Sequence, residues 1–191
     1  MAADPVLVAA PMATAEVPVA AGVPTNARQR VLPVAPPRLK APELGEPFGV
    51  LRIPRLGAGY EFVAVEGVRD RDLAAGPGHY PGTALPGEVG NFVLSAHRTS
   101  HSAPFADIDE LLPGDRVLFA AAGGTFTYRV VASEVVKPTA LDVLLPVPGE
   151  PGAMPSQALL TLITCHPEHS TAERLVVTAQ LAHFTPAAPG G

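Results

Sequence analysis

The only cysteine of the chain stands at the end of an apolar run, and an arginine opens the next one. Cys165 closes the segment TLITC (161–165), and Arg174 follows nine residues later. A thiolate at the mouth of a strand can act as a nucleophile when a nearby cation stabilises it. Because the connection between the two runs is short, we expect neighbouring strands that return Arg174 beside Cys165. The plain alternative for Cys165 is a buried, inert thiol, the commoner fate of free cysteines.

The alternation of residues after Arg174 predicts the direction of its side chain. One face of this run is uniformly apolar and is expected inside; it consists of Leu175, Val177, Ala179 and Leu181. Arg174 therefore lies on the outer or groove-facing side. A guanidinium there could stabilise a thiolate and a developing oxyanion. The alternative is a solvated surface arginine, which is more frequent for this residue type.

A thiolate nucleophile also needs a group that donates and accepts protons. The chain has six histidines: His79, His97, His101, His166, His169 and His183. His97 ends the apolar run NFVLSAH and therefore also lies at a strand mouth. His101 lies in a loop, and the side chain of His166 would point away from that of Cys165 in an extended chain.

Two groups of residues resemble metal ligands only superficially. Cys165, His166 and His169 give the spacing C-H-x-x-H, but a structural zinc ion normally takes four well-placed ligands. The acidic residues between 107 and 110 are better interpreted as a solvated helix face. We expect no metal and no cofactor.

Length and composition exclude several classes of protein. The chain has 191 residues, a net charge of −5 and 47% hydrophobic residues, so it can bury a core and has no basic footprint for nucleic acid. One cysteine cannot form an internal disulfide. The apolar stretch 6–23 is interrupted by Pro11, Glu16 and Pro18, so it predicts no membrane anchor and a chain that is soluble as given.

The pattern of short apolar runs predicts the organisation of the chain. Residues 1–46 are rich in Ala, Pro and Val without periodicity and predict a flexible tail or stalk. The folded domain is expected over 47–185, with a flexible C-terminus at 186–191. Expected strands lie at 48–54, 61–67, 91–97, 116–121, 125–136, 157–165 and 174–184, with Gly123-Gly124 as a hairpin turn. These short strands and few helices predict an all-β barrel or sandwich.

Three segments resemble the sortase family, and most of all its class E members from actinobacterial cell surfaces. TLITC (161–165) resembles the TLxTC signature, followed at Arg174 by the family arginine. SAHRTSHSAPFADIDELLPGD (95–115) resembles the segment around the family's essential histidine. FGVLRIPRLG, together with GPGHYPGTALPGEVGNFVLSAHR, resembles the N-terminal half of the catalytic domain. The resemblance covers roughly residues 47 to 183.

The resemblance implies an eight-stranded sortase-type β-barrel with transpeptidase activity. Such an enzyme cleaves a sorting motif, Leu-Ala-x-Thr-Gly in class E or Leu-Pro-x-Thr-Gly, between Thr and Gly. Carried over, Cys165 attacks the Thr carbonyl, His97 is the general acid and then base, and Arg174 stabilises the oxyanion. The implied partners are the sorting-signal peptide of a surface protein and a peptidoglycan precursor amine. The implied location is the outer face of the cell membrane or the cell wall.

Substrate selection draws on two further residues. Tyr80, in the segment GPGHYPGTALPG, is the candidate for the pocket that prefers Ala at the second motif position; the alternative is an aromatic half-buried under its own loop. Thr164 precedes the nucleophile and is expected to give a backbone or hydroxyl contact to the oxyanion. The long loop 146–156 would border the substrate groove.

Two departures from the family pattern and two rival functions accompany this interpretation. Ala96 stands where sortases commonly have glycine, and the membrane helix that usually tethers them is missing. An L,D-transpeptidase would carry H-G-C-x-R around its cysteine, which this chain lacks. A non-catalytic cell-surface module with an idle thiol is the second rival, and the presence of Cys165, His97 and Arg174 together argues against it.

Overall fold

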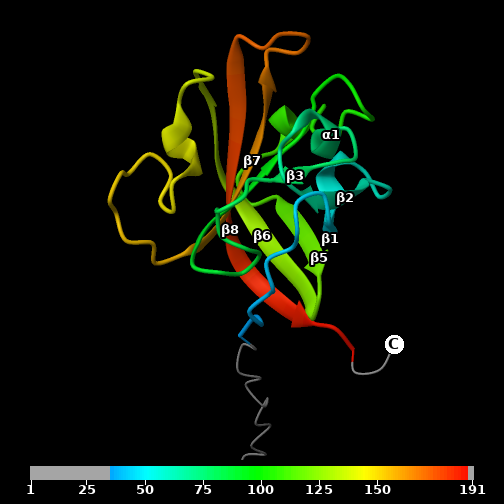
Figure 1. Cartoon of the computed structure of the whole chain (residues 1–191), viewed down its shortest axis with the longest axis vertical. Helices are drawn as coiled ribbons and strands as arrows, with labels where there is room; N and C mark the ends of the chain where they lie inside the picture. Colours follow the sequence, from blue (N-terminus) through cyan, green and yellow to red (C-terminus); the bar gives the residue numbers. More distant parts are fainter. Residues whose placement is uncertain (1–34, 189–191) are drawn as a thin grey trace, which may run out of the picture. The chain divides into compact units, whose positions relative to one another are not determined.

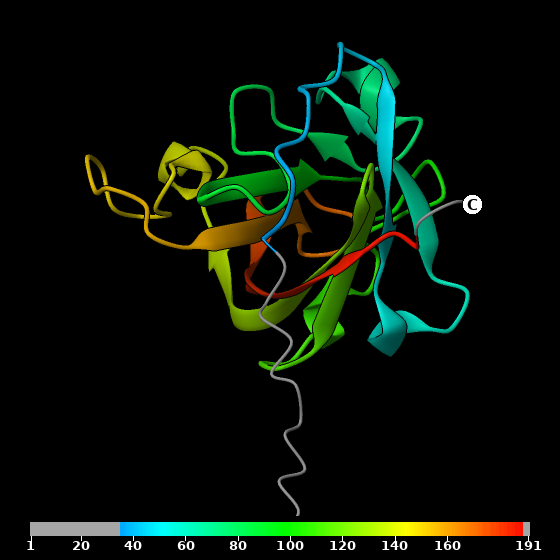
Figure 2. The same ribbon diagram turned by 90° about the horizontal axis from the view of Figure 1, so that it is seen from below.

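Eight strands close into a barrel in the computed structural model, which describes residues 35–188. Most of the predicted tail, residues 1–34, and residues 189–191 lie outside the described part. The strands are β1 (Pro47–Arg52), β2 (Glu61–Glu66), β3 (Gly78–His79), β4 (Gly90–Ser95), β5 (Arg116–Ala121), β6 (Gly124–Val136), β7 (Ala158–His166) and β8 (Glu173–Pro186). Their order around the barrel is β1-β2-β3-β4-β7-β8-β6-β5. Figures 1 and 2 show the barrel from two directions. The expected all-β barrel is therefore confirmed.

Alternating side chains on the strands divide the apolar residues into an inner and an outer set. The inner set fills the barrel and includes Phe92 and Leu94 of β4, Leu160 and Leu162 of β7, and Leu175, Val177 and Ala179 of β8. The outer set is a smaller cluster formed by Val93, Ile163, Val176 and Val143. The inward face predicted for the run after Arg174 is thus observed for three of its four residues, with Leu181 packed at the edge of the core.

Within residues 35–188, four short helices lie in the connections between the strands. They are η1 (Pro54–Leu56), α1 (Asp70–Leu73), η2 (Ile108–Glu110) and η3 (Leu141–Leu144). The sequence pattern did not predict strand β3, which pairs in parallel with β2 and antiparallel to β4. It has only two residues between glycines and prolines, too few to show an alternating pattern.

The predicted hairpin joins β5 to β6. Ala121 pairs with Gly124, so Ala122 and Gly123 form the turn. Gly123 has a φ of 89°, a left-handed conformation that favours glycine. The turn glycine of the sequence is therefore explained by backbone conformation.

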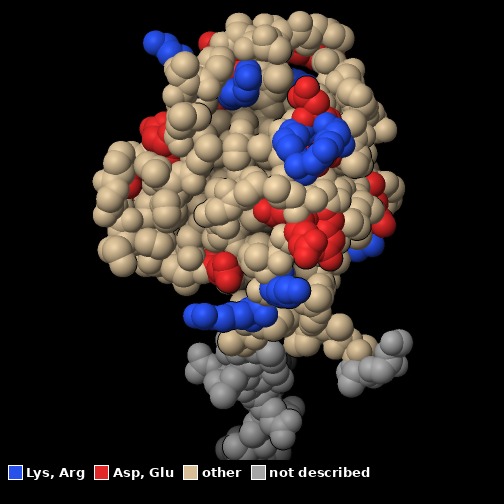
Figure 3. All heavy atoms as spheres, in the orientation of Figure 1, with Lys and Arg blue, Asp and Glu red and all other residues tan. Residues whose placement is uncertain are grey.

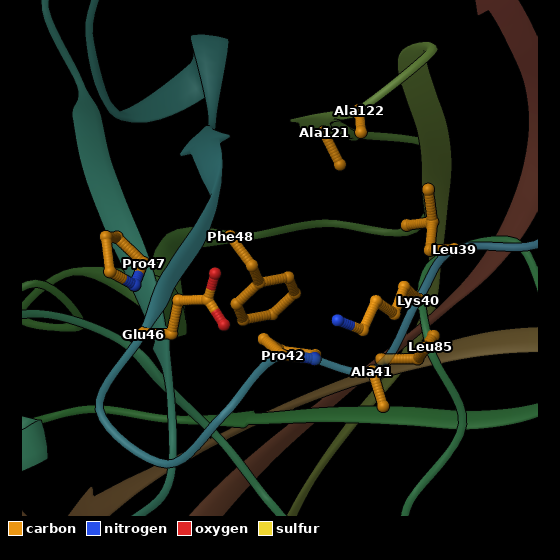
Figure 4. A pocket seen from close by; sticks show the side chains of 10 residues that line it. All are labelled: Leu39, Lys40, Ala41, Pro42, Glu46, Pro47, Phe48, Leu85, Ala121 and Ala122. Atoms are coloured by element: carbon orange, nitrogen blue, oxygen red, sulfur yellow. The ribbon is translucent and has the colours of Figure 1, made fainter.

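Residues 35–46 lie against the barrel, although they belong to the segment that the sequence assigns to the tail. Leu39 packs against the inner core, and Gly45 N–H donates to the carbonyl oxygen of Glu66 at 2.7 Å. Figure 4 shows Leu39, Pro42 and Phe48 around a pocket of about 320 Å³ beside β1. The folded unit therefore begins before β1.

Charged side chains are scattered over the surface. On the face in Figure 3, Lys and Arg lie next to Asp and Glu over a mostly uncharged surface. Examples of paired charges are Arg52 with Glu61 at 2.7 Å and Arg55 with Asp115 at 3.2 Å. Among residues 35–188, no helix has the length and apolar character needed to cross a membrane.

Candidate functional site

Cys165 and Arg174 are direct partners in the antiparallel ladder between β7 and β8. Directly opposed residues of such a ladder project to the same side, with Cβ atoms about 4.5–5.5 Å apart. The side is the outer one, because their neighbours Ile163 and Val176 pair in the same ladder and belong to the outer cluster. The return of Arg174 beside Cys165, expected from the sequence, is what the register shows.

The guanidinium of Arg174 is bonded to the loop between β7 and β8. Its Nη1 donates to the carbonyl oxygens of Thr171 at 3.0 Å and Glu173 at 2.8 Å. These bonds hold the cation at the end of the hairpin, where half-buried Cys165 is the residue paired with Arg174 in the ladder. The site therefore has one fixed positive charge on the β8 side.

His97 reaches the same end of the sheet from β4. Strand β4 runs parallel to β7, and their paired residues end with Ser95 opposite Ile163. Two residues further along both chains, His97 stands level with Cys165. Because side chains alternate and Ala96 belongs to the inner core, His97 is on the outer side with Cys165.

Hydrogen bonds continue the pairing of the two chains beyond β4. Ala96 N–H donates to the Ile163 carbonyl oxygen at 3.2 Å, and the buried Thr164 hydroxyl donates to the Ala96 carbonyl oxygen at 2.9 Å. The Thr164 hydroxyl therefore donates its hydrogen bond to Ala96, the residue before His97. Ala96 itself is buried, and its methyl group packs in the core.

A strained loop follows His97. Its residues His101, Ser102 and Ala103 all have positive φ, of 50°, 64° and 43°. The ring of His101 stacks on that of His97, with 4.9 Å between ring centroids. Phe105 N–H donates to the His97 carbonyl oxygen at 3.0 Å, so the loop folds back on the histidine.

The loop is also anchored from β2's side of the barrel. The Tyr60 hydroxyl donates to the carbonyl oxygen of Pro104. Burial and the negative charge of Asp107 raise the pKa of Tyr60 well above its ordinary value, so this hydroxyl stays protonated. The anchor persists across the neutral pH range.

Tyr80 lies at the outer cluster, close to the candidate catalytic residues in the fold. It follows β3 and packs against Val93, Ile163 and Val176, together with Leu144 of η3. Its ring is half-buried. The position of Tyr80 agrees both with a role in the substrate pocket and with a half-buried aromatic ring. It packs on the cluster that contains Ile163, two residues before Cys165.

Asn91 fastens η3 to the barrel over the outer cluster. Its side-chain amide donates to the carbonyl oxygens of Val143 at 2.9 Å and Leu145 at 3.1 Å. The Thr161 hydroxyl donates to Asn91 Oδ1 at 2.7 Å. One buried amide thus fixes the segment that forms a wall of the outer surface.

The long loop after η3 lines a hollow on the same side of the sheet. Pro146 and Pro155 of this loop face the segment 82–91 across a pocket of about 350 Å³. The pocket lies at the beginning of β4 and β7, and His97 and Cys165 lie at their ends. About six residues of strand, roughly 20 Å, separate the two, a length that an extended peptide of five or six residues spans.

Two of the remaining histidines lie beside carboxylates of their own. His169 is exposed, 3.5 Å from Glu168, and His79 is buried against Glu66 with 2.5 Å between Nδ1 and Oε2. In the described range 35–188, no group of three or more His, Cys, Asp or Glu side chains is arranged to hold a metal ion.

Sequence reasoning missed one residue near the site. Arg98 follows His97 and is only 6% exposed. Its guanidinium contacts His166, the residue after Cys165, and Asp109 of η2. Nothing local in the sequence distinguishes this arginine from a surface one, since its contact with His166 joins residues 68 positions apart.

Comparison with known proteins gives a family match over most of the described residues. The sequence model of the sortase domain family matches residues 51–182. Sortase SrtE1 of Streptomyces coelicolor is 32% identical over 157 residues, which cover 78% of this chain and 44% of that protein. Sortase D of Bacillus subtilis is 39% identical over 95 residues, covering 50% of this chain and 46% of that protein. The matched region therefore spans less than half the length of each relative.

Solved structures with the same barrel agree with the sequence match. The SrtF sortase from Corynebacterium diphtheriae superimposes with a TM-score of 0.76 at 29% identity, covering 84% of this chain and 96% of that one. Sortase E from Streptomyces avermitilis gives a TM-score of 0.68 at 36% identity, covering 75% of this chain and 93% of that one.

Proposed function

This chain belongs to the sortase family, and on that premise we propose that it is a cysteine transpeptidase acting on sorting signals of surface proteins. The proposed substrate motif is Leu-Ala-x-Thr-Gly or the related Leu-Pro-x-Thr-Gly, cut between Thr and Gly. The observation that carries the proposal is the register of β4, β7 and β8, in which His97, Cys165 and Arg174 stand at one end of the sheet on its outer side.

In the first half-reaction, the sulfur of Cys165 attacks the carbonyl carbon of the motif Thr. The tetrahedral oxyanion that forms is stabilised by the guanidinium of Arg174. When the Thr–Gly bond breaks, His97 donates a proton to the departing Gly amine. The Thr acyl group then remains on Cys165 as a thioester.

In the second half-reaction, an amine attacks the thioester carbonyl. His97, now neutral, accepts the proton that the amine loses, and the thiolate of Cys165 leaves. The product is a new amide bond between the surface protein and the acceptor. The proposed acceptor is an amine of a peptidoglycan precursor, and water is the slower competitor.

The outer surface between Tyr80 and η3 supports a groove for the motif. Tyr80 and Leu144 flank the apolar cluster that leads from the pocket near Asn91 towards Cys165. We assign Tyr80 to the selection of the second motif residue. For Thr164, whose hydroxyl is bonded to Ala96, the assignment is a backbone contact to the oxyanion.

The relatives also suggest where the domain acts. Sortases act at the cell surface, and we propose the outer face of the cell membrane or the cell wall as the site of this reaction. A motif at the end of an exported protein and a peptidoglycan amine meet there.

Trapping the thioester tests the proposal directly. The protein is incubated with peptides that differ only in the second motif residue, Ala or Pro, and the intact mass is measured. We expect the mass of the protein to increase by that of the peptide fragment up to and including Thr. A larger fraction of the protein should carry this adduct with the Ala peptide than with the Pro peptide. Cys165→Ala should form no adduct and cleave no peptide, and His97→Ala and Arg174→Ala should each lose at least about 10²-fold in cleavage rate.

The result also separates the rival functions. A wild-type protein that forms no adduct with any peptide, yet is folded, would exclude sorting-signal cleavage and favour a non-catalytic surface module. Cleavage that survives in the His97→Ala variant would reassign the acid, most directly to His101, whose ring stacks on His97.

A further inference from the structure

Arg98 is a buried arginine that follows His97 and contacts the residue after Cys165. Its Nη1 is 2.9 Å from His166 Nδ1, its Nη2 donates to Asp109 Oδ2 at 2.7 Å, and its Nε donates to the Ala106 carbonyl oxygen at 3.2 Å. A buried guanidinium is costly unless its charge and its donors are satisfied. All three nitrogens have partners here, so the arrangement is a built network.

The network connects the ends of β4 and β7 on the inner side of the sheet, opposite His97 and Cys165. His97 and Cys165 stand level on the outer side, so the next residues, Arg98 and His166, are level on the inner side. The Arg98–His166 bond therefore links the chain after β4 to the last residue of β7. Asp109 adds η2 and the strained loop that folds back on His97.

The chemistry of the bond fixes the state of His166. Arginine has only donors, so His166 Nδ1 must be the acceptor, and the ring proton is on Nε2. A second proton on Nδ1 would remove the acceptor and set an imidazolium against a guanidinium. The lone pair of His166 Nδ1 is thus engaged by Arg98 and does not face the reacting groups.

We propose that Arg98 is a positioning residue for the transpeptidase site. Through His166 and Asp109 it fixes the separation between the ends of β4 and β7, and with it the distance between the imidazole of His97 and the sulfur of Cys165. This inference rests on the proposed function for its kinetic test and has a second readout that needs no substrate.

Two substitutions at His166 form a matched pair. The side-chain oxygen of His166→Asn can take the place of Nδ1 and accept from Arg98, whereas the amide of His166→Gln is one bond longer and reaches the place of Nε2. We expect His166→Asn to stay within about 3-fold of wild-type kcat. His166→Gln and Arg98→Lys should lose about 10- to 100-fold in kcat, the range that one charge-assisted hydrogen bond spans, with KM nearly unchanged.

The split between kcat and KM distinguishes positioning from loss of the groove, since Arg98 lies behind the reacting groups and not along the peptide path. Thermal unfolding checks each variant, and Arg116→Gln, at an exposed arginine of β5, is the control for loss of a cation. If Arg98→Lys does not fold, the His166 pair still decides the question, because that side chain is partly exposed.

The rate of iodoacetamide labelling of Cys165 is the second readout. The labelling rate should be lower in His166→Gln than in wild type and unchanged in His166→Asn, which is the same order as expected for kcat. Equal rates in the two His166 variants, or a folded Arg98→Lys protein with wild-type kcat and labelling, would overturn the proposal. A wild-type protein that processes no peptide refutes the proposed substrate, and the labelling series then decides on Arg98 alone.

Discussion

Cys165 and Arg174 face each other as paired residues of β7 and β8, which pairs the only cysteine of the chain with an arginine whose guanidinium is bonded to Thr171 and Glu173. Arg174 is the second residue of β8, and the alternate residues Leu175, Val177 and Ala179 pack in the core. The ladder between the two strands, and not a contact within one segment, brings these residues together.

The first prediction concerns the reactivity of this thiol. Arg174→Ala should lower the rate of iodoacetamide labelling of Cys165 at neutral pH, because it removes the cation paired with Cys165 across the ladder. Arg174→Lys keeps the charge and should label faster than the Ala variant, although it cannot make the same pair of bonds to Thr171 and Glu173. Labelling is followed by mass spectrometry of the folded protein. Equal rates in all three proteins would mean that Arg174 does not act on Cys165.

Thr164 provides a second prediction. Its hydroxyl is buried and donates to the carbonyl oxygen of Ala96, the residue before His97. Thr164→Val removes the donor at nearly constant volume and should cost about 1–2 kcal/mol in the free energy of unfolding. Thr164→Ser keeps the hydroxyl and serves as the matched control in the same urea titration. A Val variant as stable as the Ser variant would show that this bond contributes nothing.

Asn91 is expected to matter for the groove more than for the chemical step. Asn91→Leu breaks both bonds to η3 and leaves the hydroxyl of Thr161 without its acceptor. We expect a loss of about 2 kcal/mol or more in stability, from the unpaired buried groups. Peptide cleavage should show a raised KM, because η3 loosens over the outer cluster. An unchanged KM in a folded variant would argue that η3 takes no part in binding.

The N-terminal boundary of the folded unit can be tested by truncation. A chain that starts at residue 35 should be as stable as the full chain. A chain that starts at residue 47 should be less stable, because it lacks Leu39 and the bond from Gly45 to Glu66. Leu39→Ala alone should cost about 1–2 kcal/mol for a partly buried leucine. Thermal unfolding of the four proteins is the measurement. Equal unfolding midpoints would mean that residues 35–46 add nothing to stability and that the folded unit begins at residue 47.

Two buried tyrosines predict a loss of stability at alkaline pH. Burial raises the pKa of both Tyr60 and Tyr128 in the folded state. Below about pH 10, the ordinary pKa of tyrosine, both states keep the proton and the full stability is present. As the pH rises further, the unfolded chain releases these protons and the folded chain does not, so unfolding becomes more favourable.

The control for this effect is the removal of the phenol groups. Tyr60→Phe and Tyr128→Phe lose hydrogen bonds to Pro104 and Gly87 and should be less stable than wild type at neutral pH. Their unfolding midpoints should nevertheless fall less steeply above about pH 10. Parallel curves for the wild type and both variants would contradict the assignment to these tyrosines.

Local patterns were enough to predict most of the barrel and the chemical types at the site. The alternation after Arg174 distinguishes the inward Leu175, Val177 and Ala179 from the outward Arg174, and the end of an apolar run places Cys165 at a strand mouth. These signals are local because the side-chain period of a strand is two residues. Where the period had no room to repeat, as in β3, the strand was missed.

Only the tertiary structure decided which strand ends meet. The parallel pairing of β4 with β7 joins Thr164 to Ala96, 68 residues apart, and with it brings His97 level with Cys165. The contact of Arg98 with His166 and the contact of Leu39 with the core are likewise long-range. Such contacts depend on how the closed barrel orders its strands, and no periodicity within a single segment encodes that order.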